Sequence, residues 1–93
     1  MPRLQIKGTQ IAVPNSVGAA SNFGNATCVR LVNNSNSSGR TVTVAEDNSG
    51  STTIGTFSLL SGQTEYLEKN PTDVVYVGGG TDCLGAKIAY PVN

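Results

Sequence analysis

Apolar and polar residues alternate in several short runs along this chain, and Gly-, Asn- and Ser-rich turns separate the runs. Thr27, Val29 and Leu31 fall on one side of the run from 26 to 32, and the side chains between them fall on the other. Successive side chains of a strand point to opposite faces, so this pattern predicts β-strands. With turn signals about every 8 to 12 residues, the runs indicate an all-β fold.

The fold class that we predict is a single small antiparallel β-sandwich, or a partly open barrel, of about seven short strands. The run 26–32 should form a hairpin with 41–46 across the polar loop 33–40, and Gly55 should mark a β-bulge. The segment 78–85 should be a glycine-rich connection. The expected strands are 3–7, 11–13, 26–32, 41–46, 52–60, 64–69, 74–77 and 86–92.

Ninety-three residues fit one domain, and a chain of this size has a thin stability margin, so help from a partner is expected. Residues 26–93 should form the sandwich core. Residues 1–25 should form N-terminal strands or an arm, in which 15–25 is a loop or extended segment. This arm is a candidate docking segment, and its apolar contact residues are Leu4, Ile6, Ile11 and Val13.

The composition excludes several classes of protein. Gly, Ser, Thr and Asn make up 39 of the 93 residues, yet the net charge is zero and 38% are hydrophobic, which favours a turn-rich fold over disorder. The six basic residues form no stripe that would bind nucleic acid. There is no signal-peptide-like apolar segment and no run of about 18 apolar residues, so we expect a protein made in the cytoplasm without a membrane span.

The sequence offers little support for a catalytic or cofactor-binding site. The chain has no His, which removes Ser-His-Asp and Cys-His triads and the usual zinc ligand. Glu65 and Glu68 are three positions apart on an expected strand, so they should point to opposite faces and cannot share a proton. The run Gly78–Gly80 lacks the Lys-Ser/Thr and the helix of a phosphate-binding loop. We therefore expect no enzyme and no cofactor.

Two further kinds of site remain to be weighed. Acidic and amide side chains near turns would suit calcium, but their spacing matches no dedicated calcium loop, so no metal is expected; they are Asp47, Asn48, Asp73 and Asp82. Cys28 and Cys83 would either form a disulfide or remain two buried thiols. Without an export signal, we favour the free thiols.

The stretch "GTFSLLSGQTEYLEKNPTDVVYV", residues 55–77, places a cluster of charges around Pro71. We interpret the cluster, which consists of Glu65, Glu68, Lys69 and Asp73, as the polar face of a strand, turn and strand. The stretch consists of an apolar strand, a Ser-Gly-Gln turn, a Glu-Lys strand and a strand that begins with Asp. In this order of segments it resembles small virion structural proteins of tailed bacteriophages, particularly marine and cyanobacterial phages. The resemblance covers residues 41–90.

The resemblance implies a β-sandwich on the capsid surface of the virion, assembled in the host cytoplasm. It would act as a decoration or cement protein that stabilises contacts between capsid subunits, and it brings no catalytic residues. Its partners would be the major capsid protein and neighbouring copies of itself. The alternative is a tail or baseplate module, or a carbohydrate-binding sandwich, that recognises the host. Sugar binding requires exposed aromatic side chains, whereas Tyr66, Tyr76 and Tyr90 lie within apolar runs and should pack in the core.

Overall fold

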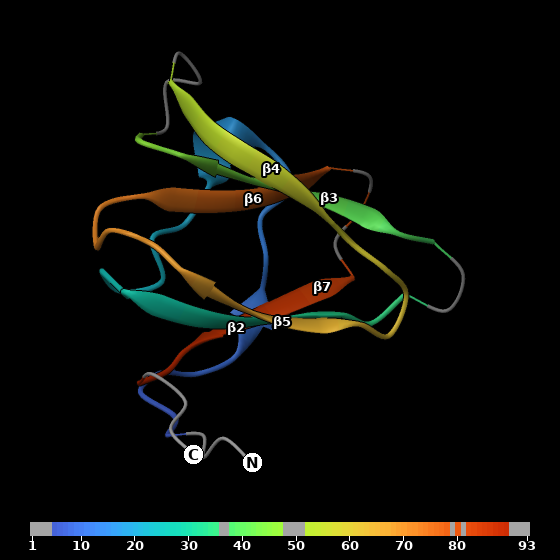
Figure 1. The fold of residues 1–93 in the computed structure, drawn as a ribbon, viewed down its shortest axis with the longest axis horizontal. Coiled ribbons are helices and arrows are strands. Elements are labelled where there is room, and N and C mark those ends of the chain that lie inside the picture. Colours follow the sequence, from blue (N-terminus) through green and yellow to red (C-terminus); the bar gives the residue numbers. More distant parts are fainter. Residues whose placement is uncertain (1–4, 36–37, 48–51, 79, 81, 90–93) are drawn as a thin grey trace.

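The computed structural model describes residues 5–35, 38–47, 52–78, 80 and 82–89, which form two antiparallel sheets packed face to face (Figure 1). One sheet has the strand order β1-β7-β2-β5, and the other has the order β4-β3-β6. The predicted seven-stranded sandwich is thus confirmed, and its sheets do not close into a barrel. The strands are β1 (Ile11–Ala12), β2 (Cys28–Asn33), β3 (Arg40–Ala45), β4 (Thr53–Leu59), β5 (Thr64–Glu68), β6 (Val74–Gly78) and β7 (Cys83–Lys87).

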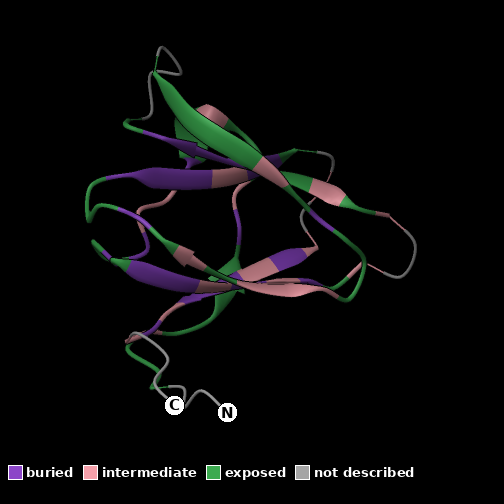
Figure 2. Ribbon diagram, in the orientation of Figure 1, coloured by how far each residue is buried: buried purple, intermediate pink, exposed green. Residues whose placement is uncertain are grey.

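Apolar side chains from both sheets meet in one core between the layers, where Figure 2 shows the buried parts of the strands. Period-two alternation produces this core: Val29 and Leu31 are fully buried, whereas Arg30 between them is only half-buried. Each fully buried aliphatic side chain contributes about 1.5–3 kcal/mol relative to exposure. The main cluster comprises Val13, Phe23, Ala26, Val29, Leu31, Val42, Val44, Leu59, Val75, Val77 and Cys83.

The predicted hairpin of 26–32 with 41–46 is wrong, because these two runs lie in different sheets. β2 pairs with β5 and β7, whereas β3 pairs with β4 and β6. The side-chain amide of Asn33, at the end of β2, is fully buried and donates to the carbonyl oxygen of Leu59 in the opposite sheet at 2.8 Å. A polar contact of this kind between the layers favours a connection that crosses from one sheet to the other, rather than a hairpin turn within one sheet.

The hairpin that does form joins β3 to β4. Its register shifts between Val44 and Ala45, so that Ile54 is the extra residue opposite them. This irregularity confirms the bulge that was predicted at Gly55.

The C-terminal strand begins three residues earlier than predicted, since β7 spans Cys83–Lys87 and contains Gly85. Gly85 pairs with Leu31 of β2 and lies against the ring of Phe23, where an added Cβ would be 2.8 Å from two ring carbons. A glycine inside a strand is the expected solution where another group packs this closely. The predicted continuation of the strand over 90–92 lies outside the described residues.

The N-terminal segment runs along both sheets rather than away from them. Ile6 bridges Ile88, and β1 pairs with β7 at the edge of the four-stranded sheet. Farther along, the carbonyl oxygen of Pro14 accepts a hydrogen bond from Val77, and a bridge joins Ser21 to Val75. This segment therefore covers the β6 edge of the three-stranded sheet.

Within the described residues, the one helical segment is the 3-10 turn Val17–Ala19, and no helix is long and apolar enough to cross a membrane.

Candidate assembly surface

The four predicted docking residues have different surroundings. Ile6 and Ile11 are exposed by 66% and 42%, so their side chains are available for contact with a partner. Val13 is fully buried in the core, and its amide donates to Cys83. Naming Val13 as a docking residue was therefore wrong, because the chain turns inward after β1. Leu4 lies outside the described residues.

Two strand edges on one side of the sandwich, those of β4 and β5, have no neighbouring strand in the described part of the chain. Figure 2 shows that β4 is exposed over most of its length. An unpaired edge presents free N–H and C=O groups and is a template for pairing with another chain. Sequence periodicity finds strands but not their order, so these edges became apparent only from the fold.

The hydrogen bonds of β6 show which groups of β4 are free. The amides of Val75 and Val77 donate away from β3, to Ser21 and Pro14. On β3, Val44 pairs with Val75 and Val42 pairs with Val77. Because hydrogen-bonded and non-bonded pairs alternate along an antiparallel ladder, the backbone groups of Val42 and Val44 must point toward β4. Phe57 pairs with Val42, so its N–H and C=O bond to β3.

Thr56 and Ser58 lie on either side of Phe57 in the strand. Their N–H and C=O groups therefore point outward at the open edge. Both residues are exposed, and the described part of the chain holds no partner for these groups.

The same reasoning applies to β5. The amide of Lys69 donates to the carbonyl oxygen of Thr27, and the carbonyl oxygen of Gln63 accepts from the amide of Asn33. Because bonded and outward positions alternate, the odd-numbered residues of β5 bond to β2. The backbone groups of Tyr66 and Glu68 therefore point outward.

The two open edges differ in charge. β4 contains no charged residue, whereas β5 carries Glu65 and Glu68. The ladder pairs Glu65 with Leu31 and Glu68 with Cys28, which puts the two carboxylates on opposite faces, as predicted. Tyr66 is 45% exposed, so the expectation that it packs in the core was wrong.

Among the other tyrosines, Tyr76 packs beside Ala20, Ala45 and Val74, and Tyr90 lies outside the described residues.

A cavity of about 260 Å³ lies between the two open edges. Phe57 and Leu67 line it from the two sheets, and Lys69 and Asp73 lie at its border. Lys69 and Asp73 are 7% and 6% exposed, so the interpretation of the whole charge cluster as a solvated face was wrong for these two. They are buried because each satisfies backbone groups of neighbouring turns.

Lys69 holds the turn at residues 22–26. Its ammonium donates to the carbonyl oxygens of Asn22 at 3.0 Å, Ala26 at 2.7 Å and Asn70 at 3.3 Å. Burial lowers the pKa of Lys69, and the charge of Asp73 partly opposes this effect. With its donors directed at the backbone, Lys69 is a structural residue.

The turn that Lys69 holds has an uncommon backbone. Phe23, Gly24 and Asn25 all have positive φ, of 55°, 68° and 59°. Residues other than glycine adopt positive φ only at a cost in free energy, so contacts with the surrounding structure must hold them in this conformation. The side chain of Asn22 accepts from the amides of Gly24 and Asn25, and Lys87 donates to the carbonyl oxygen of Gly24 at 3.0 Å. The turn directs the ring of Phe23 into the core.

Asp73 satisfies the turn that follows β5. Its carboxylate accepts from the amide of Asn70 at 3.1 Å, and its own amide donates to the carbonyl oxygen of Asn70. Asn70 and Asp73 therefore close the turn around Pro71 through hydrogen bonds to each other.

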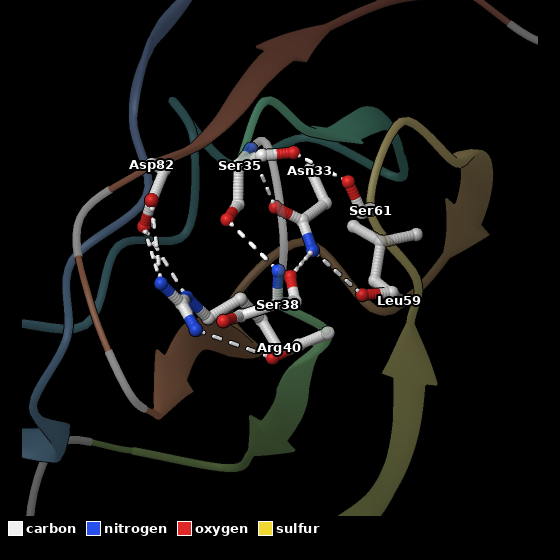
Figure 3. A network of polar contacts seen from close by, with 8 residues as sticks. Asn33, Ser35, Ser38, Arg40, Leu59, Ser61 and Asp82 are labelled. Carbon is white, nitrogen blue, oxygen red and sulfur yellow. Dashed lines mark hydrogen bonds and ion pairs between the residues drawn. The ribbon is translucent and has the colours of Figure 1, made fainter.

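A second polar network fixes the crossing from β2 to β3 (Figure 3). The Asn33 amide donates to Ser38 and Leu59, and its oxygen accepts from the amide of Ser35 at 3.0 Å. Beside it, the guanidinium of Arg40 contacts both carboxylate oxygens of Asp82, at 3.0 and 3.2 Å. These hydrogen bonds from Arg40 are the main cause that lowers the pKa of Asp82.

No group of three or more His, Cys, Asp or Glu side chains comes together among the described residues. Of the residues weighed for calcium, Asp73 and Asp82 have the structural partners described above, Asp47 is exposed, and Asn48 lies outside the described residues.

Cys28 and Cys83 are buried free thiols. Cys83 pairs with Asn33, whereas Cys28 accepts a backbone hydrogen bond from Ile88, so they lie at opposite ends of the β2–β7 ladder. Five residues of strand place their Cα atoms roughly 17 Å apart. A disulfide requires about 7 Å or less, so the alternative of a bridge within the chain is wrong. Burial raises the pKa of both thiols, which keeps them protonated.

Comparisons of the chain with protein-family models, with curated proteins and with solved structures find no match. The open β4 and β5 edges, with the exposed Ile6 and Ile11, are the features from which a function is inferred below.

Proposed function

We propose that this chain is a structural protein of a tailed bacteriophage particle, a decoration protein that binds the outer surface of the head and stabilises contacts between major capsid subunits. The observation that carries the proposal is the pair of open strand edges on one side of the sandwich. Main-chain pairing at such edges gives affinity without a conspicuous side-chain motif. The resemblance of residues 41–90 to phage virion proteins supports the same assignment.

The surface suits repeated, individually weak contacts. Thr, Ser and Gly dominate the exposed part of β4, and the chain has no net charge, so many copies can sit side by side without repulsion. Copies bound in a regular array are also held by avidity, which a single contact of modest size does not supply.

The experiment that tests this function is the location and copy number of the chain in purified phage particles. Antibody labelling under the electron microscope, together with quantitative mass spectrometry against the major capsid protein, should find many copies spread over the head. A few copies at the tail would support a tail module instead, and absence from the particle would refute a virion role.

A host-recognition module is the second candidate, and the observation that favours it is the exposed ring of Tyr66 on β5. Carbohydrate sites use exposed aromatic rings as platforms. If this candidate is right, Tyr66→Ala should abolish binding of the purified protein to host cells. Binding that persists in this variant, or that is absent from the wild type, would exclude it.

A further inference from the structure

The open edge of β4 has the symmetry needed to pair with a second copy of itself. Thr56 and Ser58 both direct N–H and C=O groups outward, and Phe57 lies between them with its own groups bonded to β3. In an antiparallel pair centred on Phe57, Thr56 of each copy faces Ser58 of the other. Both residues then exchange two hydrogen bonds with their partner, so every outward group of the two positions is satisfied.

Exposed apolar side chains lie at both ends of this pair. Ile54 of one copy lies at the same end as Leu60 of the other, although Ile54 is the extra residue of the bulge and does not follow the strict alternation of the ladder. These two residues are 54% and 63% exposed, and they are among the few large apolar side chains that the sandwich leaves in solvent. In the dimer these side chains lie beside the shared edge, where they lose contact with water, and the two Phe57 rings lie at the axis beside the cavity that Phe57 lines.

The distribution of charge favours β4 over β5 as the contact between copies. No charged side chain lies on β4, so two β4 strands approach without repulsion. Two β5 strands would bring Glu65 and Glu68 of one copy next to those of the other, which is unfavourable. The β6 edge is already covered by Pro14 and Ser21 of the same chain.

We infer that β4 mediates a twofold dimer in which Phe57 lies at the axis and the two three-stranded sheets join into one sheet of order β6-β3-β4-β4-β3-β6. This inference concerns the contact between copies alone and does not depend on the particle on which the protein acts. A symmetric contact of this kind closes on itself, so it yields dimers and not fibres.

The first test is the mass of the purified full chain in sedimentation equilibrium, from about 1 µM to about 1 mM, the range of a contact of this small size. A species of twice the 9.6 kDa chain mass is expected. A monomer throughout the range, or an open-ended series of polymers, would overturn the inference.

Substitutions then test the edge. Proline has no N–H, and the N–H of Thr56 points outward rather than toward β3. Thr56→Pro should therefore keep the fold, because no bond to β3 is lost, and should abolish the dimer. Tyr66→Pro is the matched control, since it removes an outward N–H at the other open edge and should leave the dimer intact. Loss of the dimer in Tyr66→Pro alone would assign the contact to β5 and overturn the inference.

Paired charges test the register without proline. In the double variant T56K/S58E, each lysine faces a glutamate of the other copy, whereas in T56K/S58K lysine faces lysine. We expect the dissociation constant of T56K/S58K to exceed that of T56K/S58E by about tenfold, and a mixture of T56K/S58K with T56E/S58E to recover the dimer. Equal constants, or a weaker T56K/S58E dimer, would contradict a pair centred on Phe57.

Discussion

Lys69 and Ala26, which are 43 positions apart in the chain, are joined by a buried hydrogen bond of 2.7 Å from the ammonium to the carbonyl oxygen. This bond connects the end of β5 to the left-handed turn that places Phe23 in the core. The turn 22–26 is thereby held by a side chain whose charge, judged from sequence alone, looks like part of a solvated surface.

Removing the ammonium should destabilise the fold. Lys69→Met keeps most of the aliphatic length but leaves the buried carbonyl of Ala26 without its donor, at a cost of about 1–3 kcal/mol in the free energy of unfolding. Urea denaturation would measure it. Lys87→Met is the control, because Lys87 contacts Gly24 at an exposed position, and its cost should stay below about 0.5 kcal/mol. A Lys69→Met variant as stable as the control would show that Lys69 does not hold the turn.

Gly85 should tolerate no side chain. A Cβ at this position would be 2.8 Å from the Phe23 ring and 3.1 Å from Leu31, so Gly85→Ala should cost about 1–3 kcal/mol through overpacking. Gly78→Ala is the matched control, because nothing lies within 4 Å of a Cβ there. Thermal unfolding of the two variants compares them, and equal melting temperatures would mean that the ring does not pack against Gly85.

The ion pair of Arg40 and Asp82 should make stability depend on pH in the acid range. The pKa of Asp82 in the folded state lies below its ordinary value of 3.8, so the unfolded chain binds more protons between the two values. The contribution of Asp82 is therefore present above about pH 4 and is lost as the pH falls through the folded-state pKa.

The measurement is the free energy of unfolding in urea from about pH 6 down to about pH 2 for the wild type and for Asp82→Asn. The acid loss of stability should be smaller in Asp82→Asn, whereas the exposed control Glu46→Gln should behave as the wild type. An identical acid loss in the wild type and Asp82→Asn would show that the Arg40 contact contributes nothing.

The N-terminal segment should divide into a structural and a surface part. Val13→Ala removes buried methyl groups and should cost about 1–3 kcal/mol, whereas Ile11→Ala at an exposed position should cost less than about 1 kcal/mol. If the segment also docks on a partner, Ile6→Ser and Ile11→Ser should weaken attachment to phage heads in a co-sedimentation assay and leave the melting temperature unchanged. A stable Val13→Ala variant would contradict its place in the core.

Alternation together with the spacing of turns predicted the sandwich and most of its strands, because the inward residues of β2, β3 and β6 are apolar at every second position. It did not predict pairing, since β2 and β3 have equally apolar inner faces and only contacts such as Asn33 with Leu59 decide that they lie in different layers. The first three residues of β7, which include Gly85, were missed because a glycine looks like a turn residue until the ring beside it is known.

The candidate surface was predicted less well than the fold. Ile6 and Ile11 were named as contact residues of the N-terminal segment and are exposed, whereas Val13, named with them, is buried. The edges of β4 and β5 are defined by strand order, which local sequence does not encode. The burial of Lys69 also depends on a turn more than forty residues away.

Amide hydrogen exchange at the two open edges tests the central claim most directly, namely that the chain acts on a phage head through main-chain pairing. It would be measured on the dilute free protein and on the protein bound to purified heads. We predict that the amides of Thr56 and Ser58 on β4, and of Tyr66 and Glu68 on β5, exchange rapidly in the free chain, and that those of at least one edge become protected on the head. Head-bound protein with unchanged exchange at both edges, or no binding to heads, would contradict the account.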